Sequence, residues 1–536
     1  MSTQLKIVEL FSGIGSQAKA LRNIGADIKV VATCEWDIHA IVAYDAIHNR
    51  TDKIEPEYES LETSQLNNLL YSFSVSADGK KPMSCSTIRD LSRESKQRIL
   101  SAIKRTNNLV NIQKVNGKDL PGRVDIMTYS FPCQDLSNVG ALHGYKKGIA
   151  RDAGNRSCML WEVERILKER KENGLHLPKF LVMENVPTLL SDRHRNNFEE
   201  WISVLNELGY HSKYFCLNAL QFGCPQNRYR MLMISTYIGQ KKEIGLKLDD
   251  YYNNHNLEKM EFQKKLDLTK TDLCSCLHID YSNKRDYNEA LECQPNDTPS
   301  RKKIWDDNLK IVGENNVILT DHVATITTKQ DRHPNSGNIW FDPPNNKSRY
   351  RFLTPRECFQ IMGFQENDYD SLIEYNCFPN VKYTLFSRDK VHRLAGNSIP
   401  VKLLEAVFSL VLDIQNIGIA RTAPPKRKPQ NIKTVLHDLG LSFKSWNMSL
   451  PGTSNYYVKK YKTIIQVRDC IMLHHNQCEI LSKARKNFAS PKNKSRSAVD
   501  EAKDAAITKE YNVIRIWKCE IDNGACYEII KRGLMI

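Results

Sequence analysis

Three short stretches carry side chains that could do covalent chemistry together. The first is Ser130-Phe-Pro-Cys133-Gln-Asp-Leu-Ser137, which follows an apolar run, residues 124–129, that we expect to be a buried strand. Cys133 would then stand at the carboxyl end of that strand, where open α/β sheets place their chemistry. A cysteine on such a loop is well placed to act as a nucleophilic thiolate, although free cysteines are also common in protein cores.

A carboxyl group and two guanidinium groups follow further along the chain. The apolar run of residues 179–183 ends in Glu184, and a glutamate at the mouth of an apolar strand can have a raised pKa and act as a general acid. Its plain alternative is a surface glutamate at a strand end. Arg228 and Arg230 are two positions apart before another apolar run, so a strand would point both to one face, toward an anionic or carbonyl partner.

The elements that would position these groups begin at the N-terminus. Residues 5–11 predict a strand, 12–16 a tight glycine turn, 17–23 a helix and 28–33 a second strand that leads into Glu35 and Trp36. This pattern is typical of a nucleoside-binding βαβ unit, in which glycines let the backbone approach the ligand and the later acid holds ribose hydroxyls. Trp36 would pack on an adenine ring or in the core. Residues 13–18 also satisfy the loose dinucleotide fingerprint GxGxxA, so the turn by itself leaves NAD as a rival cofactor.

The length and the net charge of the chain restrict the remaining alternatives. The chain has 536 residues, too many for one ordinary domain, and 77 Lys+Arg against 62 Asp+Glu give a formal net charge of +15. That balance suits a nucleic-acid partner, although a solvated basic surface would produce it as well. We expect no membrane segment, because no apolar run reaches the roughly 18 residues of a membrane helix. The 15 cysteines have no disulfide-scaffold spacing, which indicates a reducing interior.

Together these stretches resemble the motifs of the DNA (cytosine-5) methyltransferases, in that family's order, over roughly residues 5–412. A second glycine is usual in that family where Ser16 stands, and an NAD-binding protein would not be expected to carry the later motifs. The matching residues are Phe11 to Gly15, Glu35-Trp36, Asp90, Pro132-Cys133-Gln134, Glu184-Asn185-Val186, Gln226 to Arg230, Arg351 to Phe364 and Gly396 to Pro400.

The resemblance implies a mechanism and a set of site residues. Cys133 would attack C6 of a cytosine swung out of the helix, Glu184 would supply a proton to its N3 side, and Arg230, with Arg228 as second choice, would hold its carbonyl. C5 would take the methyl group of S-adenosyl-L-methionine. The implied cofactor contacts are Phe11, Gly13, Ile14, Gly15, Glu35, Trp36, Asp90, Pro132 and Asn397. Asp90 would end a third strand and accept from the adenine amino group; its alternative is a helix cap.

The last hundred residues resemble the very-short-patch mismatch endonucleases. The metal-binding aspartate of that family falls on Asn455, and its catalytic histidines fall on Arg468 and Leu473, so we predict that this part does not cut DNA. Its structural zinc ligands would fall on Cys470, His475, Cys519 and, one position displaced, Cys478. A second zinc alternative, Cys274, Cys276, His278 and Cys293, is disfavoured by its uncommon spacing.

We therefore expect an α/β protein with a Rossmann-like S-adenosylmethionine-dependent methyltransferase sheet, an inserted recognition domain and a C-terminal restriction-endonuclease-like domain. The predicted divisions are 1–238 catalytic, 239–345 target recognition, 346–415 return segment, 416–431 linker and 432–536 endonuclease-like. Residues 239–342 look irregular and polar. The expected partner is double-stranded DNA, the expected state a monomer, and the expected location the cytoplasm of a bacterium, near its nucleoid, with or without a partner restriction enzyme.

Three other functions are weighed against this prediction. A transfer-RNA cytosine-5 methyltransferase would share every catalytic motif, and a fused methylase-nuclease would need the aspartate that Asn455 replaces. Amino-methyltransferases use an Asp-Pro-Pro step followed by an aromatic ring, whereas Asp342-Pro-Pro is followed by Asn345. The large recognition gap and the nuclease-like tail favour DNA cytosine-5 methylation.

Overall fold

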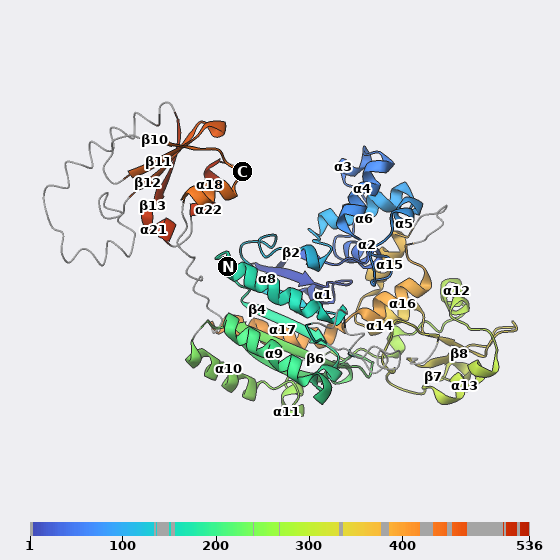
Figure 1. Cartoon of the computed structure of the whole chain (residues 1–536). Helices are drawn as coiled ribbons and strands as arrows, with labels where there is room; N and C mark the ends of the chain where they lie inside the picture. Colours follow the sequence, from blue (N-terminus) through green and yellow to red (C-terminus); the bar gives the residue numbers. More distant parts are fainter. Residues whose placement is uncertain are drawn as a thin grey trace. The chain divides into compact units, whose positions relative to one another are not determined.

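The computed structural model describes residues 4–132, 136, 149–151, 156–239, 241–266, 269–331, 336–376, 385–418, 432–446, 453–468, 508, 511–522 and 526–534. The chain divides into two compact units (Figure 1). Unit 1 comprises Met1–Glu169 with Leu177–Thr422, and unit 2 comprises Arg170–His176 with Ala423–Ile536.

A six-stranded sheet organises unit 1. Its strands run in the order β2-β1-β3-β4-β6-β5, and the first four are parallel while β6 is antiparallel to both neighbours. The bounds are β1 Leu5–Leu10, β2 Ile28–Cys34, β3 Ile126–Tyr129, β4 Phe180–Asn185, β5 Tyr210–Asn218 and β6 Tyr229–Tyr237. Every residue of β3 is buried, as expected for a parallel strand covered on both faces.

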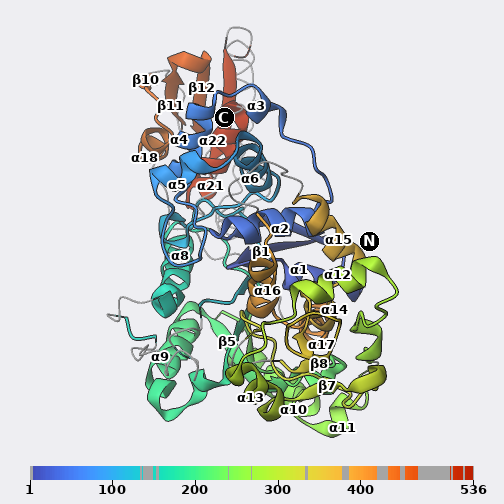
Figure 2. The ribbon, with the colours of Figure 1, turned by 90° about the vertical axis from the view of Figure 1, so that its right-hand side faces the viewer.

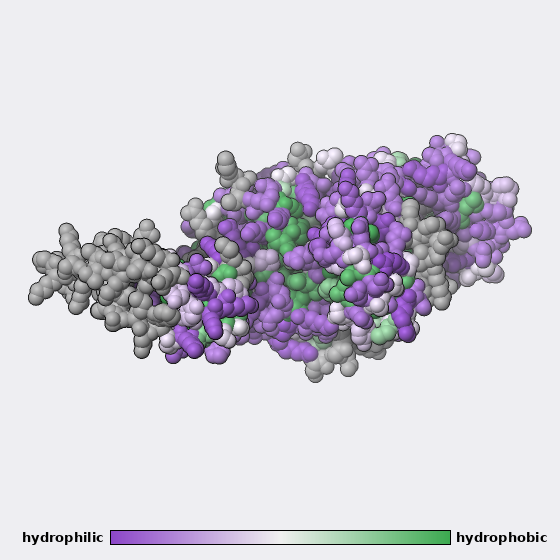
Figure 3. Space-filling view, turned by 90° about the horizontal axis from the view of Figure 1, so that it is seen from above, coloured by the Kyte–Doolittle hydropathy of each residue, from purple (hydrophilic) through white to green (hydrophobic). Residues whose placement is uncertain are grey.

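Helices cover both faces of this sheet (Figure 1). Apolar side chains of α1 (Ser16–Asn23), α2 (Ile38–His48) and α17 (Val401–Asn416) form one core, and those of α8 (Leu160–Glu172) and α9 (Asp192–Leu208) form the other. Seen from above, the protein surface is largely hydrophilic, with hydrophobic side chains gathered near the middle of the view (Figure 3). The predicted α/β layering is confirmed by this arrangement.

The segment between β2 and β3 is helical. It contains α3 Pro56–Glu59, α4 Thr63–Phe73, α5 Cys85–Asp90 and α6 Arg93–Arg105. The prediction that Asp90 ends a third strand is wrong, because Asp90 is the exposed last residue of α5. The local reason is capping: Ser84 accepts from Thr87 N and begins α5, while Ser92 accepts from Ser95 N and begins α6.

The region predicted to be irregular, residues 239–342, contains regular elements. They are α10 Lys242–Asn254, α11 Met260–Gln263, α12 Lys284–Glu292, α13 Pro299–Asp307, β7 Lys310–Val312 and β8 Asn338–Trp340. The small sheet is completed by β9 (Tyr350–Phe352), which pairs with β8. Helix α10 belongs to the main core instead, since Leu248 and Tyr252 are buried there and the Tyr251 hydroxyl donates to Asp413 at 2.7 Å.

The return segment contains α14 Pro355–Ile361, α15 Glu366–Glu374, α16 Arg388–Asn397 and α17. Among the described residues one stretch, Arg388–Asn416, is long and apolar enough to be considered as a membrane span, but 72% of its most apolar window is buried inside the protein. It consists of α16 and α17 with a break at residues 398–400. Burial of that extent is typical of a core helix, so the stretch is weak evidence for a membrane.

Unit 2 contains a four-stranded sheet of order β10-β11-β12-β13, with β12 and β13 parallel and the other pairs antiparallel. Its described elements are α18 Ile432–Asp438, β10 Lys444–Trp446, β11 Thr453–Val458, β12 Thr463–Arg468, β13 Asn512–Trp517, α21 Lys518–Asp522 and α22 Cys526–Leu534. A small core that includes Leu436, Ile465 and Ile516 holds them together.

Candidate functional site

The glycine turn after β1 is held by close backbone contacts. Gly13 and Gly15 have φ of 53° and 80°, a region that side-chain-bearing residues avoid. A Cβ at Gly15 would lie 2.1 Å from His48 Nε2, the atom that also lies 3.1 Å from the Ile14 carbonyl oxygen. No side chain therefore fits at position 15, whereas a Cβ at Gly13 would meet nothing within 4 Å.

Beneath this turn lies a buried polar layer that the sequence analysis missed. Glu9, inside β1, is fully buried; one of its carboxyl oxygens accepts from Ala18 N at 3.1 Å and the other from the Tyr44 hydroxyl. Burial raises the pKa of Glu9 to about 7, against the lowering effect of its hydrogen bonds. A charged residue in the middle of an apolar strand was the sequence signal for this layer.

The Glu35 carboxylate joins the turn to the end of β2. Its Oε2 accepts from Gly13 N at 3.0 Å, and its Oε1 accepts from Trp36 N and Asp37 N at 2.9 Å each. Burial, helped by the charge of Asp37, raises the pKa of Glu35 to about 7, while those backbone hydrogen bonds oppose the rise. Trp36 is half-buried beside it. An acid held at the glycine turn, with a partly exposed indole next to it, suits the ribose and adenine of a nucleoside cofactor.

The place next to Glu35 that was predicted for Asp90 is taken by Asn108. The segment that contains Asn108 and Leu109 pairs with the end of β2. Asn108 forms a parallel β-bridge with Thr33, and Leu109 N donates to the Thr33 carbonyl at 2.9 Å. Asn108 Oδ1 accepts from Glu35 N, and Asn108 Nδ2 donates to the Glu35 carbonyl, each at 3.0 Å. The sequence signal for this segment was the run Asn107-Asn108, two residues before the buried Val110. The long helical insertion that precedes the run made its position beside β2 hard to predict.

The catalytic edge lies where β3 and β4 end and β6 begins. Asn185 Nδ2 donates to the Phe131 carbonyl at 3.2 Å, and Ser157 Oγ donates to the Pro132 carbonyl at 2.7 Å. These bonds place the residues just before Cys133 beside the end of β4. Cys133 itself lies outside the described residues.

Glu184 and Arg230 meet at this same edge. Arg230 Nε lies 2.8 Å from Glu184 Oε1, and both side chains are largely buried. Burial raises the pKa of Glu184 above its usual value, although the charges of Arg230 and Arg228 and a hydrogen bond from Ser130 partly oppose this. A carboxyl group with a raised pKa keeps its proton to higher pH than an exposed glutamate does, and beside a guanidinium group it can bind a polar ring edge.

Arg228 is placed differently from Arg230. It is 2% exposed, and its guanidinium group donates to the carbonyl oxygens of Ile326 at 2.5 Å, Gly396 at 2.9 Å and Ser398 at 2.9 Å. The two arginines therefore do not form one cationic pair facing a substrate. Asn397, predicted to contact the cofactor, is the exposed last residue of α16.

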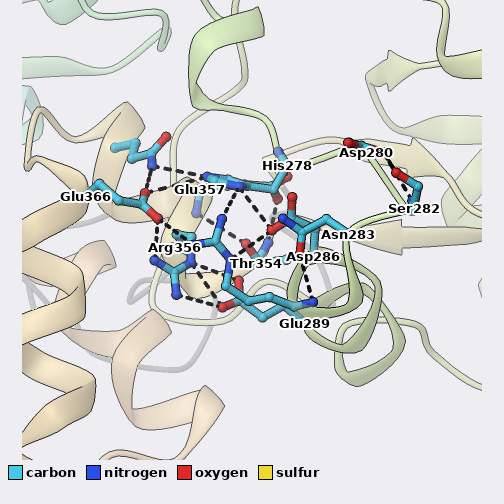
Figure 4. Close-up of polar contacts among 12 residues, drawn as sticks. His278, Asp280, Ser282, Asn283, Asp286, Glu289, Thr354, Arg356, Glu357 and Glu366 are labelled. Atoms are coloured by element: carbon cyan, nitrogen blue, oxygen red, sulfur yellow. Dashed lines mark hydrogen bonds and ion pairs between the residues drawn. The ribbon is translucent and has the colours of Figure 1, made fainter.

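A charged network fastens the insert to the return segment (Figure 4). Arg351 and Glu357 form a fully buried ion pair at 2.8 Å, and Glu357 also accepts from His278 N at 2.9 Å. Burial alone would raise the pKa of Glu357, but Arg351 holds it below its usual value. Arg356 pairs with Glu289 at 2.9 Å. This network gives the insert a defined attachment.

The second zinc alternative is not supported by these contacts. His278 lies 3.1 Å from Gln360 Nε2 and 3.3 Å from an Arg285 nitrogen, while Cys274 is exposed and Cys276 and Cys293 are buried. Within the described ranges, no group of three or more His, Cys, Asp or Glu side chains is placed to hold a metal ion. Of the zinc ligands predicted in the tail, Cys470, His475 and Cys478 lie outside those ranges, and only Cys519 is described, in α21.

Comparison with known proteins identifies the class. The family model for C-5 cytosine-specific DNA methylase matches residues 81–412, more than half of the chain. The protein therefore belongs to the C-5 cytosine-specific DNA methylase family. This confirms the predicted enzyme class, a DNA cytosine-5 methyltransferase of the S-adenosyl-L-methionine-dependent type.

Two relatives and one solved structure illustrate the likeness. The orphan methyltransferase M.SssI of Spiroplasma monobiae is 38% identical over 237 residues, which cover 44% of this chain and 59% of that protein. The type II methyltransferase M2.ScrFI of Lactococcus lactis subsp. cremoris is 29% identical over 414 residues, which cover 75% of this chain and 98% of that protein. The S. pombe Dnmt2 methyltransferase structure is 18% identical, with a TM-score of 0.46, and covers 77% of this chain and all of that one.

Proposed function

We propose that this protein transfers a methyl group from S-adenosyl-L-methionine to C5 of a cytosine within a specific sequence of double-stranded DNA. The observation that carries the proposal is the buried Glu184–Arg230 ion pair, 2.8 Å apart, at the sheet edge where residues 130–132 lead into Cys133. The nucleoside-type turn around Glu35 belongs to the same sheet. The acid, the arginine and the residues just before the expected nucleophile thus approach one edge from three separate stretches of sequence.

In this mechanism the cofactor supplies the methyl group, and the protein holds both reactants. The backbone of Gly13, Ile14 and Gly15 would lie along the cofactor. Phe11 and Pro132 would lie beside the cofactor, and Asn397 would lie near the loop that carries Cys133. Glu35 would accept from its ribose hydroxyls and Trp36 would pack on its adenine. Asn108, rather than Asp90, stands beside Glu35, and its side-chain amide holds the Glu35 backbone in place.

The target cytosine must leave the base stack, because its C5 and C6 atoms are otherwise inaccessible. Cys133 would bond to C6 as a thiolate, and protonated Glu184 would donate toward N3, so that negative charge does not build up on the ring. Arg230 would hold the cytosine carbonyl. C5 would then take the methyl group, with S-adenosyl-L-homocysteine as the leaving group. Loss of the C5 proton to solvent would re-form the C5–C6 double bond and release Cys133 as the thiolate.

Exposed cations of the insert suit the DNA backbone. Lys302 and Lys303 are exposed on α13, with Lys302 3.5 Å from Asp297. Arg301 is engaged by Asp331 at 3.3 Å, which leaves the lysines as the better phosphate contacts. Residues 325–333 are a second part of the insert that could read bases, and its last residue, His333, lies outside the described residues.

Methylation of plasmid DNA should separate the alternatives. With labelled S-adenosyl-L-methionine we expect label in plasmid DNA and none in transfer RNA, and bisulfite sequencing should give one recurrent site. Label in transfer RNA alone would overturn the DNA assignment. A parallel arm with Mg²⁺ should leave the plasmid supercoiled, because Asn455, paired with Gln466 in the β11–β12 ladder, offers amides rather than the carboxylates that Mg²⁺ needs.

The cellular setting follows from the same proposal. The relatives named above include a type II and an orphan methyltransferase, which supports a bacterial modification enzyme acting in the cytoplasm at the nucleoid, with or without a partner restriction enzyme. We favour a monomer. The C-terminal unit would then be an inactive restriction-endonuclease-like appendage.

That unit would also bind a structural zinc ion through Cys470, His475, Cys478 and Cys519. Thiolates and an imidazole in this number are a suitable tetrahedral set. We expect about one zinc per purified chain by elemental analysis and a loss of most of it in Cys519→Ala, with the exposed Cys85→Ala as control. Zinc content that is unchanged in Cys519→Ala would contradict this ligand set.

A further inference from the structure

The buried Arg228 joins three parts of unit 1 that are far apart in sequence. It stands immediately before β6, where its backbone N–H donates to Asn218 Oδ1 at 3.0 Å. Its side chain donates to Ile326, in the insert, and to Gly396 and Ser398, where α16 gives way to α17. A planar guanidinium group donates from several nitrogens in a fixed fork, whereas a lysine ammonium donates from a single nitrogen and does not reproduce that geometry.

The same junction is closed by a second, independent feature. Gly396 lies so near the insert that a Cβ there would be 2.4 Å from the carbonyl carbon of Thr327 and 2.5 Å from Thr328 N. Beside it, Ile326 N donates to Gln226 Oε1 at 2.9 Å. The insert segment at residues 323–328 thus lies against the end of α16 and is bonded to the chain entering β6.

Helix α16 continues this connection toward the cofactor side. Figures 1 and 2 show α16 between α2 and the small sheet of the insert. Arg393, on α16, pairs with Asp37 at 2.6 Å, and Asp37 N donates to the Glu35 carboxylate. One helix therefore contacts the insert directly and, through Asp37, is linked to the acid expected to hold the cofactor ribose.

We propose that Arg228 is a positioning residue that couples the target-recognition insert to the catalytic pair, rather than a residue that contacts the cytosine. Arg230 follows it by two residues, within β6, and holds Glu184. When the insert binds its correct DNA sequence, the Arg228–Gly396 junction thereby couples this binding to the placement of Glu184 and Arg230. This inference rests on the proposed roles of Glu184 and Arg230.

The test compares variants of the full chain on two DNA substrates. Plasmid methylated by the wild-type protein and bisulfite-sequenced defines the site, and duplex oligonucleotides then carry either that site or one altered base. Arg228→Lys keeps the positive charge but not the branched hydrogen bonds. We expect kcat on the correct site to fall about tenfold or more, and the ratio of kcat/KM between correct and altered sites to fall with it. The dissociation constant for S-adenosyl-L-methionine should stay within about threefold of wild type.

Gly396→Ala damages the same junction from the other side and should give the same pattern. If both variants break one coupling, the double variant should be no worse than about twofold beyond the poorer single variant. Arg98→Lys on α6 is the matched control, since Arg98 is a largely buried arginine that bonds Glu94 and the Asp52 carbonyl, and it should behave as wild type.

Two results would overturn the coupling: Arg228→Lys and Gly396→Ala with wild-type kcat and site preference, or fully additive losses in the double variant. Failure of the proposed function is distinguishable from these. Arg230→Lys should lose kcat while keeping the preference for the correct site, and a fully active Arg230→Lys protein would refute the catalytic assignment itself.

Discussion

A chain in which Cys133 is replaced by alanine is expected to lose methyl transfer to background while still binding S-adenosyl-L-methionine. The sulfur is the proposed nucleophile, and the methyl group of alanine cannot form the bond to C6 in its place. The bonds that position residues 131 and 132 come from Asn185 and Ser157, so they remain in the variant. Incorporation of label into plasmid DNA is the measurement, and the exposed Cys85→Ala is the control. A Cys133→Ala protein that still methylates DNA would refute the mechanism.

Trapping gives a direct view of the same sulfur. If the target cytosine carries fluorine at C5, the final loss of a proton from C5 cannot occur, and the bond from sulfur to C6 should persist. Wild-type protein should then migrate with the DNA on a denaturing gel, whereas Cys133→Ala should not. A crosslink that forms equally well in the variant would assign the nucleophile to another residue.

Glu184→Gln is expected to lower kcat by a factor on the order of 10² or more, because the amide cannot deliver a proton to the ring. The wild-type rate should also depend on pH in a defined direction. Since burial raises the pKa of Glu184, its acid form persists to higher pH than in an exposed glutamate, and kcat should decline as pH rises through that value.

The pH dependence distinguishes an acid from a structural residue. Glu184→Gln should lack this decline and remain uniformly slow, whereas Glu199→Gln, an exposed substitution on α9, should keep both the rate and the decline. The assignment fails if Glu184→Gln retains the wild-type profile. Steady-state rates measured from about pH 6 to pH 9 cover the range in which a raised carboxyl pKa would act.

Local patterns predicted the catalytic half of the fold well. The apolar runs before Cys133 and Glu184 are strands β3 and β4, and the glycine turn is followed by helix α1 as expected, because each of these signals is confined to a few neighbouring residues. Where two short-range signals competed, the prediction failed. Asp90 stands two residues after Ile88 and two before Ser92, a pattern that suits a strand end or a helix cap, and capping by Ser84 and Ser92 decided the outcome.

Contacts between residues that are far apart in the sequence could not be predicted from local patterns. Arg228 and Arg230 share a spacing that predicts a common face, yet one is bound by carbonyls of residues about 100 and 170 positions away, while the other pairs with Glu184. Likewise, α10 looked like part of the insert and is held in the main core by Tyr251 and Asp413. Partners at such separations leave no local signature.

The reversal of β6 has a consequence for how the reaction is prepared. Residues Phe180 to Asn185 of β4 pair without interruption with Thr236 to Met231 of β6, so the spacing between acid and arginine is set by the backbone ladder itself. Glu184 and Arg230 are therefore in place before any nucleic acid binds. The thiol belongs to a segment beyond the last residue of its strand, and the flipped base is brought in by the DNA. The group expected to supply the proton is therefore positioned by the sheet itself. The start of the reaction then depends on the arrival of the thiol and of the flipped base.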